Sequence, residues 1–279
     1  MLSLDAPTVA VTWCAAFLSV VGVPLTLPSA HWPILFLSLA TWLCYVGDRT
    51  QDARSAHGAP AELRARHHFY GHCWQNQRGL LVGLVSLAAL ACATTGLLGL
   101  SARLLVDYAA LTLASLLYFA WVHSGRERTA RVLAKEAAVA IIFALGCILP
   151  AWSCASIALR SQLAPAAVLF ALLCWLNCVA IERWEGKGLV GPSAHASTRW
   201  AARHLSALLI ASASTAAALA IWRHSVGRPT ALAPYLACAF ILLAGLERWR
   251  LRLSVDSLRI FADVALLTPL AWFAARISG

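Results

Sequence analysis

The chain alternates between long apolar runs and short polar connections along its whole length. A helix crosses the bilayer core with about 20 apolar residues, in a range of roughly 17 to 25, and nine runs approach or reach that length. We therefore predict an all-α, polytopic membrane protein, a nine-transmembrane-helix bundle, with residues 1–279 in one domain. The predicted spans are Pro7–Leu27, Trp32–Asp48, Gly79–Leu98, Leu104–His123, Lys135–Trp152, Pro165–Glu182, Arg203–Trp222, Pro229–Leu246 and Leu258–Ile277.

The composition supports this assignment to the membrane class. Hydrophobic residues make up 61% of the chain and charged residues only 12%, with a mean hydropathy of +0.73. Soluble domains carry about twice that charged fraction, so a soluble globular protein is excluded. The first apolar run has no basic segment before it and is long enough to span, which predicts a retained helix rather than a cleaved signal peptide.

The distribution of basic residues predicts the topology. Most of the 22 lysines and arginines fall in the connections after the second, fourth, sixth and eighth predicted spans. Basic connections favour the cytoplasmic side, which predicts a multi-pass protein of the plasma (inner) membrane with a cytoplasmic N-terminus and a C-terminus on the opposite side. The net charge of +10 then reflects topology and attraction to anionic lipid headgroups. No nucleic-acid-binding motif accompanies it, so we expect no nucleic-acid partner.

Two aspartates stand one helical turn apart where the second predicted span ends. Asp48 and Asp52 share a helix face, so their oxygens can bind one Mg²⁺ and, through it, a phosphate. Ionisable groups at membrane depth are costly, which favours a functional interpretation. The alternative is a solvated helix end in which Arg49 forms local ion pairs.

The segment that contains these aspartates resembles the first motif of the UbiA-type membrane prenyltransferases, Asn-Asp-x-x-Asp-x-x-x-Asp. Asp48 and Asp52 correspond to its last two aspartates, whereas Cys44 and Tyr45 stand at its first two polar positions. Members of this family are nine-helix bundles that transfer a prenyl group from a polyprenyl diphosphate to a small acceptor with Mg²⁺. The resemblance implies the same fold, activity and cofactor here.

Two further parts of the chain bear on this resemblance. Tyr118, the pair Lys135-Glu136 and Gly146 are similar to the family pattern at the end of helix four and in helix five. The second family motif, Asp-x-x-x-Asp after helix six, is altered, because Arg183 and Lys187 stand at the positions of its two aspartates.

The acids that remain near this second motif are Glu182 and Glu185. They are three residues apart and therefore on neighbouring faces of a helix end, where a second metal site would have to be built differently from that of the family. The alternative interpretation of Glu182-Arg183-Trp184 is an anchor at the membrane interface.

The predicted site follows from the resemblance and from the needs of diphosphate chemistry, which are carboxylates for metal, cations for the leaving group and aromatic faces for an allylic cation. The predicted metal ligands are Asp48, Asp52, Glu182 and Glu185. The predicted catalytic residues are Asp48, Asp52, Arg49, Lys135 and Tyr118. The predicted substrate-binding residues are Tyr45, Trp175, Asn177, Arg183, Trp184 and Lys187.

Other interpretations remain open at this level. The missing second-motif aspartates favour a catalytically silent relative that binds an isoprenoid or lipid, and a transporter is a third possibility. His68, His72 and Cys73 have the spacing of a partial zinc site, although a basic amphipathic segment is preferred. Asp263 follows Arg259 by one turn within the last predicted span, which favours an intrahelical ion pair over the alternative of a polar wall of the site.

Overall fold

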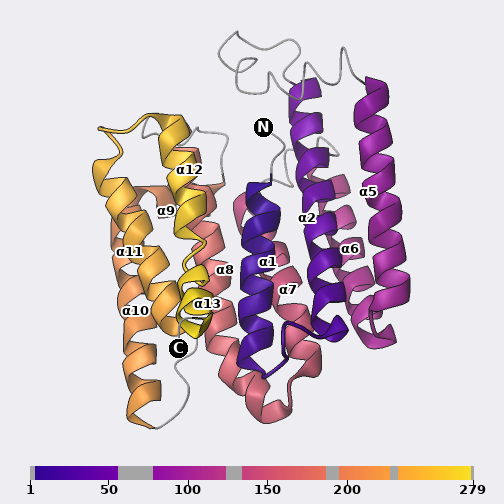
Figure 1. The fold of residues 1–279 in the computed structure, drawn as a ribbon. Helices are drawn as coiled ribbons and strands as arrows, with labels where there is room; N and C mark the ends of the chain where they lie inside the picture. Colours follow the sequence, from indigo (N-terminus) through magenta and orange to yellow (C-terminus); the bar gives the residue numbers. More distant parts are fainter. Residues whose placement is uncertain (1–3, 56–77, 124–133, 187–194, 227–231, 278–279) are drawn as a thin grey trace.

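The computed structural model describes residues 4–55, 78–123, 134–186, 195–226 and 232–277. Every regular element in these ranges is helical, and the long helices run roughly along one common direction (Figure 1). The elements are α1 (Asp5–Val20), α2 (Pro28–Ser55), α5 (Arg78–Gly99), α6 (Ala102–His123), α7 (Lys135–Cys154), α8 (Ile157–Glu185), α9 (Ala196–Arg203), α10 (Leu205–Ser225), α11 (Ala233–Trp249), α12 (Val255–Ala265) and α13 (Leu270–Ile277).

The bundle has two halves that meet along α1, α7 and α8. In the first half, α2 packs against α1 and α5, and α6 packs against α7. In the second half, α10 packs against α11, and α11 contacts α8 and α12. The two groups lie side by side in Figure 1, with α1 and α7 between them.

Five of the described helices are long and apolar enough to cross a membrane, namely α2 (over residues 28–50), α5, α7, α8 and α10. Their outer surfaces agree with this reading. Leu87, Leu90 and Leu97 on α5 are each more than 60% exposed, and such a continuous apolar surface is typical of a helix that faces lipid. The protein is therefore a helical membrane protein.

An aromatic cluster joins the two halves at the centre of the core. The Trp13 ring of α1 stacks on Phe170 of α8 with a centroid separation of 4.3 Å, and Phe17 contacts both rings. All three side chains are fully buried. Aromatic pairs in this geometry add to the van der Waals contact that holds helices together where lipid offers no hydrophobic driving force.

The last predicted span, Leu258–Ile277, is wrong as a single helix. It consists of α12 and α13, separated by a turn that contains Pro269. Proline has no N–H to donate to the carbonyl four residues earlier. The turn is supported from outside, because Trp13 Nε1 donates to the Leu266 carbonyl at 2.7 Å and Thr268 Oγ1 donates to the Tyr235 carbonyl at 2.9 Å.

Three other predicted boundaries also need correction. α1 ends at Val20 rather than at Leu27. α2 continues past Asp48 to Ser55. α8 begins at Ile157 rather than Pro165, because the Ser156 side chain accepts a hydrogen bond from the Leu159 N–H and caps the helix. The short helix α9, which was not predicted, lies before α10.

Candidate functional site

Several of the predicted site residues lie at the end of the bundle at which α2, α8 and α11 finish and α7 and α12 begin; this end is called the charged end. It lies at the top of Figure 1. Lys135 is the first residue of α7 and reaches α2, where its Nζ lies 3.3 Å from Asp48 Oδ1. The two side chains are 44% and 32% exposed. This contact, called the Asp48 pair, places a carboxylate and an ammonium group within reach of a ligand.

Arg49 and Tyr45 occupy the neighbouring face of α2. They are one turn apart, and Arg49 Nη2 donates to Tyr45 Oη at 2.7 Å while the guanidinium lies 4.9 Å from the ring centroid. Tyr45 Oη in turn donates to Asp5 Oδ2 of α1 at 3.4 Å. The alternative prediction of local ion pairs for Arg49 did not include these hydrogen bonds, which link Arg49 through Tyr45 to Asp5 on α1.

Asp5 was not predicted as a member of the site, and for Asp263 an intrahelical ion pair was favoured over a polar wall of the site. Asp263 of α12 interacts electrostatically with Asp5, Arg259 and Arg49. The predicted interaction of Arg259 with Asp263 is not exclusive, because Arg259 Nη1 also lies 3.3 Å from Glu185 Oε1 on α8. No sequence spacing relates residues 5 and 263, so only the packing of α1 against α12 could show this neighbourhood.

Tyr118 and Glu136 form a third part of the charged end. The Tyr118 hydroxyl of α6 lies within electrostatic range of Glu136 and Lys135. Glu136 accepts a hydrogen bond of 2.8 Å from Thr198 Oγ1 of α9, and Thr198 is fully buried. The sequence pattern that singled out Tyr118, Lys135 and Glu136 therefore marks residues that the fold does bring close together.

The ends of α8 and α11 carry a buried ionic group around Glu247. Trp184 Nε1 donates to Glu247 Oε2 at 2.7 Å, and Glu247 Oε1 lies 3.4 Å from Arg183 Nη2 and 3.2 Å from Arg250 Nη1. Arg183 Nη1 also donates to the Ala202 carbonyl of α9. These residues, Arg183, Trp184, Glu247 and Arg250, are called the Glu247 cluster. Arg183 and Trp184 thus hold α8, α9 and α11 together.

The remaining predicted residues have varied settings. Asn177 is buried in α8, and Trp175 and Glu182 are half-buried. Asp52 lies within α2, but its side chain is outside the described residues, as are Lys187 and the predicted partial zinc site of His68, His72 and Cys73.

The donor set is compatible with Mg²⁺ at the first motif. Within the described residues, no three histidine, cysteine or acidic side chains gather closely enough to hold a metal ion. Mg²⁺ commonly uses one or two carboxylates together with substrate phosphates, a requirement that Asp48 and Asp52 can meet. At the second motif, Glu185 lies 3.3 Å from Arg259, just as Asp48 lies 3.3 Å from Lys135, so a metal ion would compete with a basic side chain at either place.

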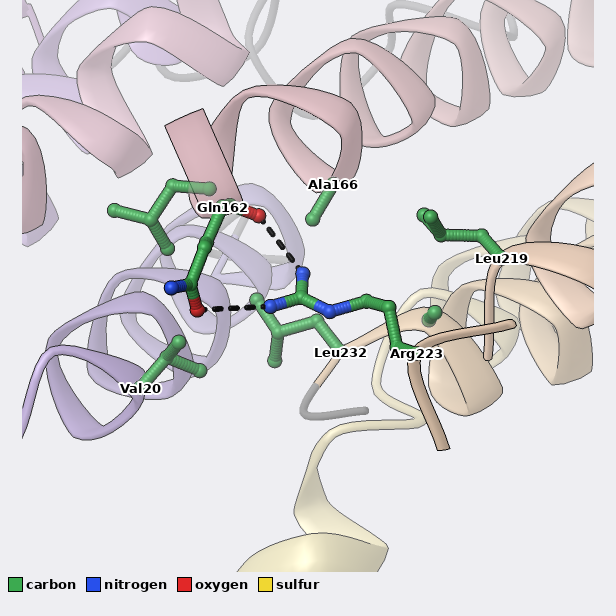
Figure 2. Close-up of a pocket in the computed structure, with 8 residues that line it drawn as sticks. Val20, Gln162, Ala166, Leu219, Arg223 and Leu232 are labelled. Carbon is green, nitrogen blue, oxygen red and sulfur yellow. Dashed lines mark hydrogen bonds between the residues drawn. The ribbon is translucent and has the colours of Figure 1, made fainter. Parts of the chain in front are cut away.

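A small pocket lies at the opposite end of the bundle, between α1, α8, α10 and α11. Figure 2 shows the Arg223 guanidinium extending toward Gln162, whose carbonyl and side-chain oxygens accept hydrogen bonds of 2.9 and 3.1 Å. The other lining side chains are apolar, among them Val20, Leu219 and Leu232. Arg223 is only 6% exposed, so this contact ties α10 to α8 inside the fold.

Comparison of the chain with family models, with curated proteins and with solved structures found no match. The case for a function therefore depends on the residues at the charged end.

Proposed function

We propose that the protein is a UbiA-type intramembrane prenyltransferase with nine spans, which moves a prenyl group from a polyprenyl diphosphate to a small aromatic or lipidic acceptor. The observation that carries the proposal is the Asp48 pair. The first-motif carboxylate stands beside a lysine from α7, and Lys135 was selected independently by its resemblance to the family pattern. Both groups keep access to solvent, as a site for a charged substrate requires.

In this proposal, basic side chains bind the diphosphate and aromatic side chains stabilise the allylic cation. Lys135 and Arg49 would hold the negative diphosphate, the lysine as a point charge and the arginine through its planar donors. The leaving group departs as pyrophosphate, so positive charge fixed near its oxygens stabilises the transition state. Tyr45 and Tyr118 would present aromatic faces to the allylic cation, and Tyr45 is oriented by Arg49 and Asp5.

Mg²⁺ bound to Asp48 and Asp52 would supply further neutralisation of the diphosphate. Glu182 is the acid of the second motif best placed to assist, because no ion pair engages it among the described residues, whereas Glu185 faces Arg259. Because the second motif is altered, Asp48, Asp52 and the nearby basic residues would provide most of the neutralisation of the diphosphate.

The proposed orientation puts the charged end at the cytoplasmic face of the plasma (inner) membrane. Described basic residues support it, because Arg49, Lys135, Arg183 and Arg250 all lie at this end. The prenyl chain would lie between helices in the bundle, and the bilayer is the partner of the apolar outer surface.

The decisive experiment measures pyrophosphate release by the protein in nanodiscs with a panel of prenyl diphosphates and small acceptors, in Mg²⁺ or in EDTA. We expect release that needs Mg²⁺ and falls by roughly a hundredfold or more in Asp48→Asn, as for loss of a group that stabilises a developing charge. Asp256→Asn is the matched control, because Asp256 is an exposed acid at the start of α12. Equal release from both variants would contradict the proposal.

A catalytically silent isoprenoid-binding protein is the second candidate, and the Glu247 cluster favours it. Arg183 of α8 pairs with Glu247, and Arg259 of α12 pairs with Glu185. These ion pairs favour a structural role for the residues around the second motif. Metal-dependent binding of a prenyl diphosphate with no release would select this candidate. A transporter has weaker support, since the described helices contain one interrupted span, α12–α13, rather than the pair of interrupted helices typical of such proteins.

A further inference from the structure

The connection between α11 and α12 carries alternating basic and apolar side chains at the charged end. Its residues, called the basic turn, are Arg248, Trp249, Arg250, Leu251 and Arg252. The Arg252 N–H donates to the Trp249 carbonyl at 2.8 Å and closes the turn. Three guanidinium groups and two large apolar side chains therefore originate from one tight stretch of backbone at the top of Figure 1.

The apolar side chains of the basic turn are open to the surroundings. Leu251 is 91% exposed and Trp249 is 59% exposed. An indole at the end of a membrane helix is typical of the headgroup region, where its ring meets apolar groups and its N–H stays hydrated. Trp200 of α9 is also 51% exposed at this end. The apolar groups therefore indicate that the basic turn lies at the level of the lipid headgroups.

The basic turn has more positive charge than the acid beside it neutralises. Glu247 pairs with Arg250, but the same carboxylate also pairs with Arg183 of α8, so one negative charge serves two guanidinium groups. Arg248 and Arg252 are exposed and form no ion pair with another residue that the structure describes. An anion at the basic turn would therefore meet both exposed guanidinium groups and an excess of positive charge.

The ligand has to match both the charge and the apolar groups. Asp256, the exposed acid at the start of α12, leaves the local net charge positive, so the ligand is an anion. A free phosphate has no part that would cover Leu251, whereas a neutral lipid has no net charge for the arginines. An anionic phospholipid offers phosphate oxygens, which arginine binds through two parallel N–H groups, and acyl chains immediately beside them.

We propose that the basic turn binds the headgroup of an anionic phospholipid in the leaflet at the charged end. Arg248 and Arg252 donate to the phosphate oxygens, while Trp249 and Leu251 lie against the glycerol and the first segments of the acyl chains. A bound lipid would fix the connection between α11 and α12 beside the Glu247 cluster. The site uses none of the residues assigned to the prenyl diphosphate and needs no Mg²⁺, so its failure and the failure of the transferase proposal are distinguishable.

The test measures which phospholipid stays bound to the full chain. The protein is released from mixed micelles that contain equal amounts of phosphatidylglycerol and phosphatidylcholine, and bound lipid is counted by native mass spectrometry. We expect the parent to favour phosphatidylglycerol. The double variant Arg248→Gln with Arg252→Gln should lose roughly fivefold of this preference for each arginine, the contribution of one basic residue at an anionic surface.

Arg103→Gln is the matched control, because Arg103 is an exposed arginine at the start of α6, at the opposite end of the bundle. It should keep the preference of the parent. An equal loss in this variant would show a response to net charge alone and would overturn the proposal, as would an unchanged preference in the double variant. The thermal unfolding midpoint of the double variant in phosphatidylcholine should equal that of the parent, and a lower midpoint there would assign the two arginines a structural role instead.

Leu251→Ser distinguishes a phospholipid from a free anion. We expect roughly three- to tenfold weaker retention of phosphatidylglycerol in this variant, because the apolar contact with the lipid is lost. A small anion would be held equally by the variant and the parent. Unchanged retention of the lipid, or its displacement from the parent by inorganic phosphate at constant ionic strength, would overturn the assignment of the basic turn to a phospholipid.

Discussion

The ends of α2 and of α8 with α11 have similar local sequences, an acid followed by an arginine, but they use their carboxylates differently. Asp48 and its partner Lys135 keep about a third and nearly half of their side-chain surface exposed. Glu247 is 4% exposed and faces two arginines and an indole N–H. Burial by neighbouring helices therefore decides whether an ion pair fixes the fold or stays accessible to a ligand. Solvent screens the exposed Asp48 pair, whereas the buried Glu247 cluster is screened little.

The largest effect on stability is expected from Glu247→Leu. This change leaves Arg183, Arg250 and the Trp184 N–H without their shared acceptor in a buried place. Removing one partner of a buried ion pair costs about 3 to 5 kcal/mol, and the loss should appear as a lower midpoint of unfolding in mixed micelles by circular dichroism. Glu247→Gln should lose less, since it retains an acceptor for Trp184.

Glu182→Leu is the matched control, because Glu182 belongs to the same end of α8 and is only half-buried. Its stability should stay within about 0.5 kcal/mol of the parent, as for surface positions without special contacts. A loss in Glu182→Leu as large as that in Glu247→Leu would show that the Glu247 cluster does not fix this half of the bundle.

The next largest effect on stability is expected at the contact between α1 and the turn that separates α12 from α13. Trp13→Phe keeps a ring against Phe170 but removes the donor to the Leu266 carbonyl, which is buried at the turn between α12 and α13. An unpaired buried acceptor costs about 1 to 3 kcal/mol. Hydrogen exchange of amides in α12 and α13 should accelerate more than that in α5. Uniform exchange across the chain would argue against a local role for this bond.

A smaller effect is expected from Thr198→Val, which preserves the shape of the side chain and removes its hydrogen bond to Glu136. The expected loss is about 1 kcal/mol, with a range of 0.5 to 1.5 for an ordinary bond. Thermal unfolding measures it, and limited proteolysis at α9 gives a local readout. Thr215→Val provides the comparison, because Thr215 is exposed on α10 and bonds only to its own helix backbone. Comparable losses in both variants would contradict a specific link between α9 and α7.

The smallest effect on stability is expected from Lys135→Met. An exposed ion pair contributes about 0 to 1 kcal/mol and is weakened by salt, so the variant and the parent should converge in stability at high salt. The Glu247→Leu deficit should persist there. A salt-independent loss above about 2 kcal/mol in Lys135→Met would place the Asp48 pair in the same class as the Glu247 cluster.

The sequence predicted the helical and membrane-spanning character of the chain because apolar length is a local property. Tyr118, Lys135 and Glu136 were singled out together and do lie at one end of the bundle. The prediction that the last span is a single helix failed, although Pro269 was visible. Whether a proline interrupts a helix or only bends it depends on partners elsewhere, here the Trp13 indole and the Tyr235 carbonyl.

The membership of the candidate site was less predictable. Asp5 and Glu247 have no motif around them that distinguishes a site residue from an ordinary helix-end acid. Their roles arise from contacts with Tyr45 in one case and with Trp184 and Arg183 in the other. Such contacts follow from which helices become neighbours, and helix periodicity indicates which face of a helix is buried without identifying the helix that covers it.

The hydrogen bond from Trp13 to Leu266 also has a consequence for the order in which the protein is made. Its two residues are 253 positions apart, so α1 leaves the ribosome long before its partner exists. Until the last helices are inserted, the indole N–H of α1 has to find another acceptor or remain unpaired in a dry environment. Insertion of α12 is therefore the event that gives α1 the acceptor for its indole N–H.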